Sequence, residues 1–405
     1  MLLYIHVPYC RSKCLYCSFY SRPFAGHSVP DEYRVTLLEE LRWWGRHQDL
    51  LFPARNVPAE EASDQKRPAA VTSVFFGGGT PSLLSAEDVG AILDAAAGCF
   101  SLAADAEVSL EGNPESLTPR KIRDLAHAGV NRLSMGVQSM HEEDLRMLGR
   151  IHTAAQVRTA CEAAHAAGIR SFNLDLMWAL PGQTTAAWLD NLRQVCELAP
   201  DHLSCYALTI EEGTPLSGML LPDRQGGLPP LPEEDECERM YLEGAAFLES
   251  RGIRQYEISN YARDGHRCRH NLGYWHGLDY LGLGPSAVST IGCRRLTSQP
   301  DTALWQRLVA AGAMPGTAEP LSARDRLYET VMLRLRMTDG LPLALYERMA
   351  GRGFAEDHAA LLPALIENGL MTIDSERVAL TRMGLLVSND IVARLFEDMD
   401  EREAG

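Results

Sequence analysis

Three cysteines lie close together near the N-terminus, in the sequence Cys10-Arg-Ser-Lys-Cys14-Leu-Tyr-Cys17, whereas the other cysteines of the chain are scattered singly. Three thiolates on one short loop can each ligate one iron of a four-iron cluster and leave the fourth iron open to a small molecule. Zinc is the main alternative, but a structural zinc site takes four protein ligands. The tight grouping argues against three unrelated thiols. The spacing therefore predicts a [4Fe-4S] centre held by Cys10, Cys14 and Cys17.

A second group of residues follows the apolar runs expected to form strands. The run Gly77-Gly78-Gly79-Thr80-Pro81 comes directly after residues 71–76. Glycines let a ligand approach the backbone closely, although a tight turn would explain them equally. Polar side chains at the carboxyl ends of successive barrel strands line one mouth. The residues expected there are Glu111 and Gln138, which end the third and fourth predicted strands, Asp175 in the fifth, and Arg150, twelve residues after Gln138.

The elements that must position these residues alternate between short apolar runs and longer stretches of helical period. The expected strands are residues 2–7, 71–76, 106–111, 132–137, 171–176 and 202–207. Such β–α repeats imply a parallel sheet with covering helices. A closed barrel has eight units. The six found here predict an α/β protein with a partial (β/α)6 TIM-like barrel, and a flat doubly wound sheet is the alternative.

The chain divides into four predicted regions. The partial barrel covers 1–215, a Pro- and Gly-rich connector 216–233, and a segment that completes the barrel 234–320. Residues 321–400 read as a C-terminal α+β domain of winged-helix type, with helices at 322–336, 342–351 and 354–368 and a hairpin at 369–380. The acidic end, 397–403, is expected to be a solvated tail.

Composition limits the classes of function. The 405 residues include 38 Lys and Arg against 54 Asp and Glu, a net charge of −16. An acidic chain is poorly suited to a polyphosphate backbone, so no nucleic-acid partner is expected. No signal peptide or membrane-spanning stretch is visible, and the cysteine usage is not that of a disulfide scaffold. We therefore expect a cytoplasmic protein that is a monomer or a weak dimer.

The Cys-x3-Cys-x2-Cys spacing resembles the motif of the radical S-adenosylmethionine (SAM) enzymes, in which the open iron binds SAM. Three further stretches resemble the oxygen-independent coproporphyrinogen III oxidase family: Tyr4-Ile5-His6-Val7-Pro8, residues 77–82 and Gly136-Val137-Gln138. This resemblance covers nearly the whole chain. It implies the partial barrel and a SAM pocket formed by Tyr4, Gly78, Gly79, Thr80, Glu111, Gln138, Arg150 and Asp175.

That family has two branches. Its true oxidases have a fourth cysteine where this chain has Phe19, and they carry an N-terminal segment before the barrel, whereas here Cys10 is the tenth residue. The HemW-type heme chaperones have the short N-terminus and an H-N-x-x-Y-W motif, here His270-Asn271-Leu272-Gly273-Tyr274-Trp275. A neutral imidazole is a common axial heme ligand, and Tyr and Trp offer flat apolar faces. The resemblance thus implies heme binding by His270, Asn271, Tyr274 and Trp275. The alternative is that His270 is a histidine packed in the core and does not bind heme.

The expected function is that of a heme chaperone with a [4Fe-4S] cluster, SAM and heme. It would pass heme to an acceptor protein, with a membrane-bound respiratory enzyme as the leading candidate. The alternative is an oxidase that decarboxylates coproporphyrinogen III to protoporphyrinogen IX. A third class, a structural zinc module with an interaction domain, would hold zinc and no iron. No residue is assigned a catalytic role.

Overall fold

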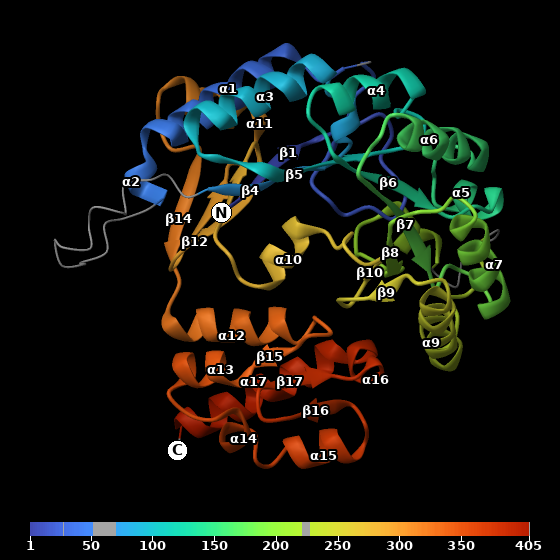
Figure 1. The fold of residues 1–405 in the computed structure, drawn as a ribbon, viewed down its shortest axis with the longest axis vertical. Coiled ribbons are helices and arrows are strands. Elements are labelled where there is room, and N and C mark those ends of the chain that lie inside the picture. Colours follow the sequence, from blue (N-terminus) through green and yellow to red (C-terminus); the bar gives the residue numbers. More distant parts are fainter. Residues whose placement is uncertain (27, 52–69, 221–226, 405) are drawn as a thin grey trace.

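Six parallel strands form the centre of the computed structural model, which describes residues 1–26, 28–51, 70–220 and 227–404 (Figure 1). Each strand pairs with the next strand of this series along the chain, so the order never reverses as it does in a doubly wound sheet. The partial barrel is confirmed, and the flat doubly wound alternative is wrong. The strands are β1 (Leu2–Val7), β4 (Val71–Gly78), β5 (Leu102–Gly112), β6 (Arg132–Gln138), β7 (Ser171–Trp178) and β8 (His202–Ala207).

Helices cover the outer face of these strands (Figure 1). Their starts follow local sequence signals: Ser85 and Thr153 each accept a hydrogen bond from the third residue of the helix they precede, in complete capping boxes. The covering helices are α1 (Asp31–Arg46), α3 (Ala86–Cys99), α4 (Pro119–His127), α6 (Ala154–Ala166), α7 (Thr185–Cys196) and α9 (Glu234–Ser250). Shorter helices are α2 (Gln48–Leu51), η1 (Pro81–Leu83), α5 (Glu142–Met147) and α8 (Pro215–Met219). Within the described residues, no helix is long and apolar enough to cross a membrane.

Further strands extend the sheet at both edges. Beside β1 lies β11 (Tyr280–Leu283), parallel to it, followed by the antiparallel strands β12 (Val288–Ile291), β13 (Arg294–Ser298) and β14 (Gly316–Pro320). Beyond β8 lie β10 (Asn260–Ala262) and β9 (Arg254–Gln255). A separate pair, β2 (Tyr9–Cys10) and β3 (Arg22–Pro23), joins the two ends of the cysteine loop. Two helices complete this part of the chain, α10 (Arg269–Trp275) and α11 (Thr302–Ala310).

The C-terminal domain combines helices with a small sheet, as expected for an α+β domain. Its first helix, α12 (Ala323–Arg334), lies directly beneath α10 in Figure 1. The sheet is β15 (Leu341–Pro342), β17 (Arg377–Leu380) and β16 (Met371–Ile373), and the predicted hairpin is its β16–β17 pair. The other helices are α13 (Leu343–Ala350), α14 (Phe354–Asp357), α15 (Leu362–Glu367), α16 (Arg382–Leu386) and α17 (Ser388–Ala404).

Two expectations for this domain were wrong. The helix predicted over 354–368 is divided into α14 and α15, because Pro363 lacks an N–H and is accommodated only in the first turn of α15. The acidic end belongs to α17, which buries Leu395 and Met399 against the domain core. The apolar residues on one face of α17 therefore pack this acidic segment against the domain as a helix.

Main-chain hydrogen bonds attach the C-terminal domain to the barrel. Ile258 N donates to Arg336 O at 2.9 Å, and Thr338 N donates to Tyr256 O at 3.1 Å. Glu257 and Met337 form an antiparallel bridge between these two bonds. The domain is thus paired with the barrel over a short strip of backbone, and α12 is held close to α10.

Trp305 anchors the edge of the sheet formed by β11 and its neighbours. Its indole is fully buried, stands 5.7 Å from the ring of Tyr33, and donates from Nε1 to Glu40 Oε2 at 3.0 Å. Trp305→Ala is expected to lower the free energy of unfolding by about 3–5 kcal/mol, because it leaves a cavity and removes one of the hydrogen bonds of the buried Glu40 carboxyl, which keeps its bond from Gly284 N. Urea unfolding measures the loss, with the half-exposed Val35→Ala on α1 as the control. A loss below about 1 kcal/mol would contradict this role.

Candidate functional site

A cavity of about 460 Å³ opens at the carboxyl ends of the parallel strands. It gathers residues that are far apart in the sequence, from the cysteine loop to the end of β8. All residues predicted for the cluster and for SAM, except Tyr4, line it together with Phe19: Cys10, Cys14, Cys17, Gly78, Gly79, Thr80, Glu111, Gln138, Arg150 and Asp175. Tyr4 lies deeper in the barrel, where its hydroxyl pairs with His6 Nδ1 at 3.1 Å.

The cysteine loop is held from several sides. Its ends are joined by the β2–β3 pair, and Phe24 N donates to Cys10 O at 2.7 Å. In the middle, Leu15 N donates to Leu148 O at 3.1 Å and Leu15 O accepts from Leu216 N at 2.9 Å. Burial raises the pKa of the Cys17 thiol. The loop therefore presents its thiols from a fixed backbone to the cavity.

Arg150 connects this loop to the strands. Its Nη1 donates to Cys14 Sγ at 3.2 Å, and its Nη2 donates to Asn113 Oδ1 at 2.7 Å and to Gly136 O at 2.6 Å. Its buried Nε has no hydrogen-bond partner among the described residues. Asn113 also donates from Nδ2 to Thr80 Oγ1 at 3.3 Å. Sequence reasoning missed Asn113, although its place two residues after Glu111 at a strand end was a usable signal.

Two carboxyl groups face the same cavity. Burial, together with the nearby charge of Asp175, raises the pKa of Glu111 to about 8, and burial raises the pKa of Asp175 to about 6. Gly78 N donates to Glu111 Oε2 at 3.2 Å, and Asn173 Nδ2 donates to Asp175 Oδ1 at 2.6 Å. Two such carboxyl groups favour a ligand that brings positive charge.

The glycine run has a structural role beside any contact with a ligand. Gly78 has a φ of +111°, and a Cβ there would lie 2.7 Å from the His6 ring. A Cβ on Gly79 would lie 2.6 Å from Tyr9 O. The turn after β4 therefore excludes side chains at both positions. Gln138, at the end of β6, also has a positive φ of +69°, which is uncommon for a residue with a side chain and marks local strain at the cavity.

The H-N-x-x-Y-W motif lies elsewhere, at the amino ends of the strands. His270, in α10, points into the barrel: its Nδ1 pairs with Ser73 Oγ at 2.9 Å, and its ring centroid is 4.9 Å from that of Phe75. Burial lowers the pKa of His270 to about 3, so the imidazole is neutral. The structure thus does not bring His270 to the cavity that contains the cysteines.

The first turn of α10 rests on one carboxylate from β5. Glu107 accepts hydrogen bonds from Arg269 N and His270 N, both at 3.0 Å, and from Cys268 Sγ at 3.4 Å. An anion at this position satisfies free N–H groups and matches the helix dipole. At the other end of α10, Tyr274 is 42 % exposed. Asn271 and Trp275 are half-buried. The motif residues therefore face different ways along α10.

Comparisons with known proteins agree with this geometry. The profile of the radical SAM superfamily matches residues 4–195, and that of the HemN C-terminal domain matches residues 321–387. The heme chaperone HemW of Escherichia coli is 36 % identical over 401 residues, which cover 96 % of each chain. The mitochondrial radical S-adenosyl methionine domain-containing protein 1 of Bos taurus is 34 % identical, over 98 % of this chain and 88 % of its own.

Among solved structures, the fold is similar to that of the coproporphyrinogen III oxidase HemN from Escherichia coli, described as a radical SAM enzyme. The TM-score is 0.77 at 24 % sequence identity, over 97 % of this chain and 89 % of that chain. At this identity the likeness shows a shared fold, which includes the barrel and the C-terminal domain.

Proposed function

Because this chain belongs to the family of the heme chaperones HemW, within the radical SAM superfamily, we propose that it binds heme and passes it to an acceptor protein. The observation that carries the proposal is the similarity to named heme chaperones along essentially the whole of both chains. A respiratory protein is the proposed acceptor. The cysteines lie within the stretch that matches the radical SAM superfamily, which disfavours the structural zinc module.

The cavity at the strand ends is the proposed site of a [4Fe-4S] cluster and SAM. Cys10, Cys14 and Cys17 would hold the cluster, since soft thiolates are its usual protein ligands. When bound, the cluster supplies an open iron for SAM and a source of one electron. The carboxyl groups of Glu111 and Asp175 suit the positive charges of SAM, and the guanidinium of Arg150 suits its carboxylate. In this proposal the chain orients SAM in a cavity that limits the access of water.

His270 is the proposed heme ligand. Its bond to Ser73 engages Nδ1, and no hydrogen bond to Nε2 is found in the part of the chain that the structure describes. A neutral imidazole with one nitrogen fixed by a partner is the usual form of a metal-binding histidine. Because the ring is buried, iron reaches Nε2 only if α10 separates from the barrel. Tyr274 and Trp275 would then contact the porphyrin, and Asn271 would lie beside it.

A second candidate function is the decarboxylation of coproporphyrinogen III, favoured by the fold shared with HemN. Phe19 argues against it, since it occupies the position where the oxidases of the family have a fourth cysteine. The Phe19 side chain lines the cavity and is 71 % exposed. It offers an apolar surface and no ligand at this position.

One experiment separates the two functions. The protein is purified and reconstituted with iron and sulfide without oxygen, then incubated with heme or with coproporphyrinogen III, SAM and a reductant. Absorption spectra, iron content and porphyrin products are read from each sample. Stoichiometric heme binding without protoporphyrinogen is the expected result. Turnover to protoporphyrinogen with no retained heme would overturn the proposal. Loss of the heme spectrum in His270→Ala is expected, and unchanged binding would exclude this ligand.

A further inference from the structure

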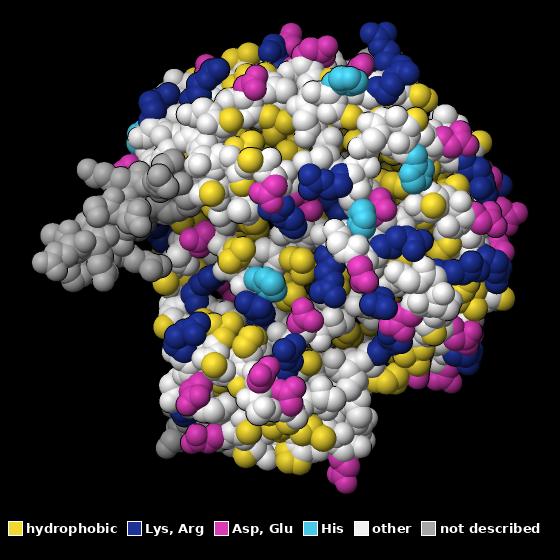
Figure 2. Space-filling model, viewed as in Figure 1, with side chains coloured by type: hydrophobic (Ala, Val, Ile, Leu, Met, Phe, Trp, Pro, Cys, Tyr) yellow, Lys and Arg dark blue, Asp and Glu magenta, His cyan; other side chains and the backbone are white. Residues whose placement is uncertain are grey.

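Exposed apolar side chains lie near arginines where α10 faces the C-terminal domain. Tyr274 and Leu278 are 42 % and 48 % exposed, and the Tyr274 ring lies 5.4 Å from that of Tyr280. On the face drawn in Figure 2, Lys and Arg side chains stand beside hydrophobic ones where α10 and α12 meet. In a chain of net charge −16, such a gathering of cations beside aromatic rings is a local exception.

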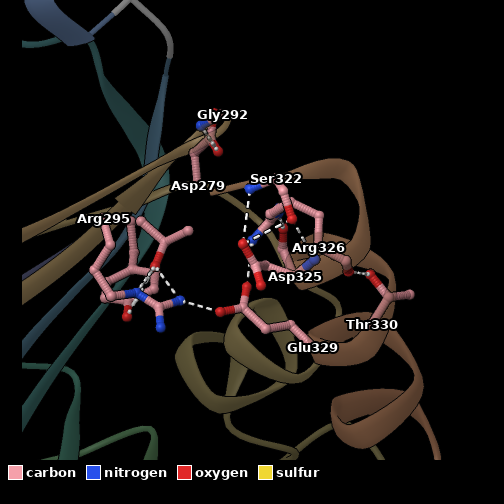
Figure 3. A network of polar contacts seen from close by, with 11 residues as sticks. Asp279, Gly292, Arg295, Ser322, Asp325, Arg326, Glu329 and Thr330 are labelled. Atoms are coloured by element: carbon pink, nitrogen blue, oxygen red, sulfur yellow. Dashed lines mark hydrogen bonds and ion pairs between the residues drawn. The ribbon is translucent and has the colours of Figure 1, made fainter. Parts of the chain in front are cut away.

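Three guanidinium groups belong to this surface. Figure 3 shows Glu329 between Arg295 and Arg326, which it binds at 2.5 Å and 2.9 Å. Two turns along α12 from Arg326 stands Arg334, and no acidic group pairs with it among the described residues. Its buried Nε also has no hydrogen-bond partner there. Two of these guanidinium groups thus share the carboxylate of Glu329, whereas Arg334 has no carboxylate partner among the described residues.

The contacts that hold these arginines to α10 are weak. Arg326 Nη2 donates to Gly277 O at 3.4 Å, and Arg334 Nη2 donates to His276 O at 3.3 Å. Both distances exceed the normal range for an N–H···O hydrogen bond. A charge-assisted bond to a carboxylate is roughly twice as strong as a neutral one. Arg334 is thus able to turn from His276 O toward an incoming carboxylate, and Arg326 is able to leave Gly277 O while it keeps its ion pair with Glu329.

We propose that the α10–α12 face, defined as Tyr274, Leu278, Arg295, Arg326 and Arg334, binds the carboxylate edge of heme. Arg334 offers one propionate a guanidinium group that no carboxylate occupies, and Arg326, which shares Glu329 with Arg295, offers a charge to the other. The apolar face of the porphyrin lies against Tyr274 and Leu278. This inference rests on the proposed heme function and assigns residues of the C-terminal domain to it. The domain then takes part directly in holding heme, through α12.

The test is the heme affinity of Arg326→Gln, Arg334→Gln and the double variant, measured by absorbance titration with hemin. Each single change is expected to weaken binding about threefold to tenfold, as for a partly exposed ion pair, and the double variant more than tenfold. Arg334→Lys should recover part of the affinity because it keeps the charge. The control is Arg120→Gln, an exposed arginine of α4 that changes the net charge equally.

Iron protoporphyrin dimethyl ester, which lacks the two charges, identifies the group that is recognised. Wild type should prefer hemin to the ester, and the double variant should bind both alike. Equal losses for hemin and ester, or no loss in the double variant, would overturn the assignment. Circular dichroism shows whether the variants are folded. SAM binding is a second check, because its proposed cavity lies at the carboxyl ends of the strands, away from α10 and α12. If wild type binds no heme, the proposed function fails, and this inference fails with it.

Discussion

Replacing Cys14 by alanine is expected to abolish binding of the proposed [4Fe-4S] cluster. The loop supplies three thiols to the cavity, and removing one leaves two irons without a protein ligand. Iron and sulfide after anaerobic reconstitution should fall from about four of each per chain to near zero. The broad absorption band of the cluster should disappear as well. Arg150 would lose its bond to Cys14 Sγ but keep its bonds to Asn113 and Gly136, so the fold should remain.

The matched control is Cys293→Ala, which removes an exposed thiol far along the chain and should leave iron and sulfide unchanged. A Cys14→Ala protein that still holds a full cluster would exclude this residue as a ligand. Zinc bound to the wild type in place of iron would revive the zinc alternative. Native gel mobility and thermal unfolding show whether the variant remains folded.

Glu111→Gln is expected to raise the free energy of unfolding at high pH and to weaken SAM binding. A carboxyl whose pKa is raised to about 8 on folding adds stability only while it is protonated, and this contribution is lost as the pH rises from about 4.5 to above 8. At pH 9 the variant should therefore be more stable than wild type, and at pH 5 nearly equal. One pKa unit corresponds to about 1.4 kcal/mol, and water in the cavity reduces the effect, so we expect about 1–3 kcal/mol. Urea unfolding across this pH range measures it.

The affinity for SAM should fall in the Glu111→Gln variant. Removal of a charged partner is expected to weaken binding about tenfold to a hundredfold. In wild type the affinity should rise between pH 6 and pH 9 as Glu111 ionises, and this rise should be smaller in the variant. Equilibrium dialysis of the reconstituted protein with SAM measures both effects. Glu162→Gln, an exposed change on α6, is the control. Unchanged SAM affinity in Glu111→Gln would remove this carboxyl from the proposed pocket.

Much of the candidate site was predictable because its signals are local. The run from Cys10 to Cys17 brings three thiols onto one loop by its spacing alone. Glu111 and Asp175 are polar residues near the carboxyl ends of apolar strand runs, and parallel strands necessarily place these ends at one edge. Sequence reasoning therefore placed ten residues, including all three cysteines, that line the cavity, without knowing their distances. It missed Asn113, whose role depends on a bond to Arg150, 37 residues away.

The sequence by itself determined the positions of the six barrel strands along the chain, the cysteine loop and the helix starts, because each depends on residues close together in the chain. The order of the strands in the sheet came from their pairing in the structure. The tertiary structure decided where the H-N-x-x-Y-W helix lies. Nothing near His270 in sequence indicates that its Nδ1 meets Ser73, 197 residues earlier, or that its helix begins on Glu107. Such contacts arise because β11 pairs with β1 and brings α10 to the amino ends of the strands. Only packing between distant segments places heme-binding candidates and cysteines at opposite ends of one barrel.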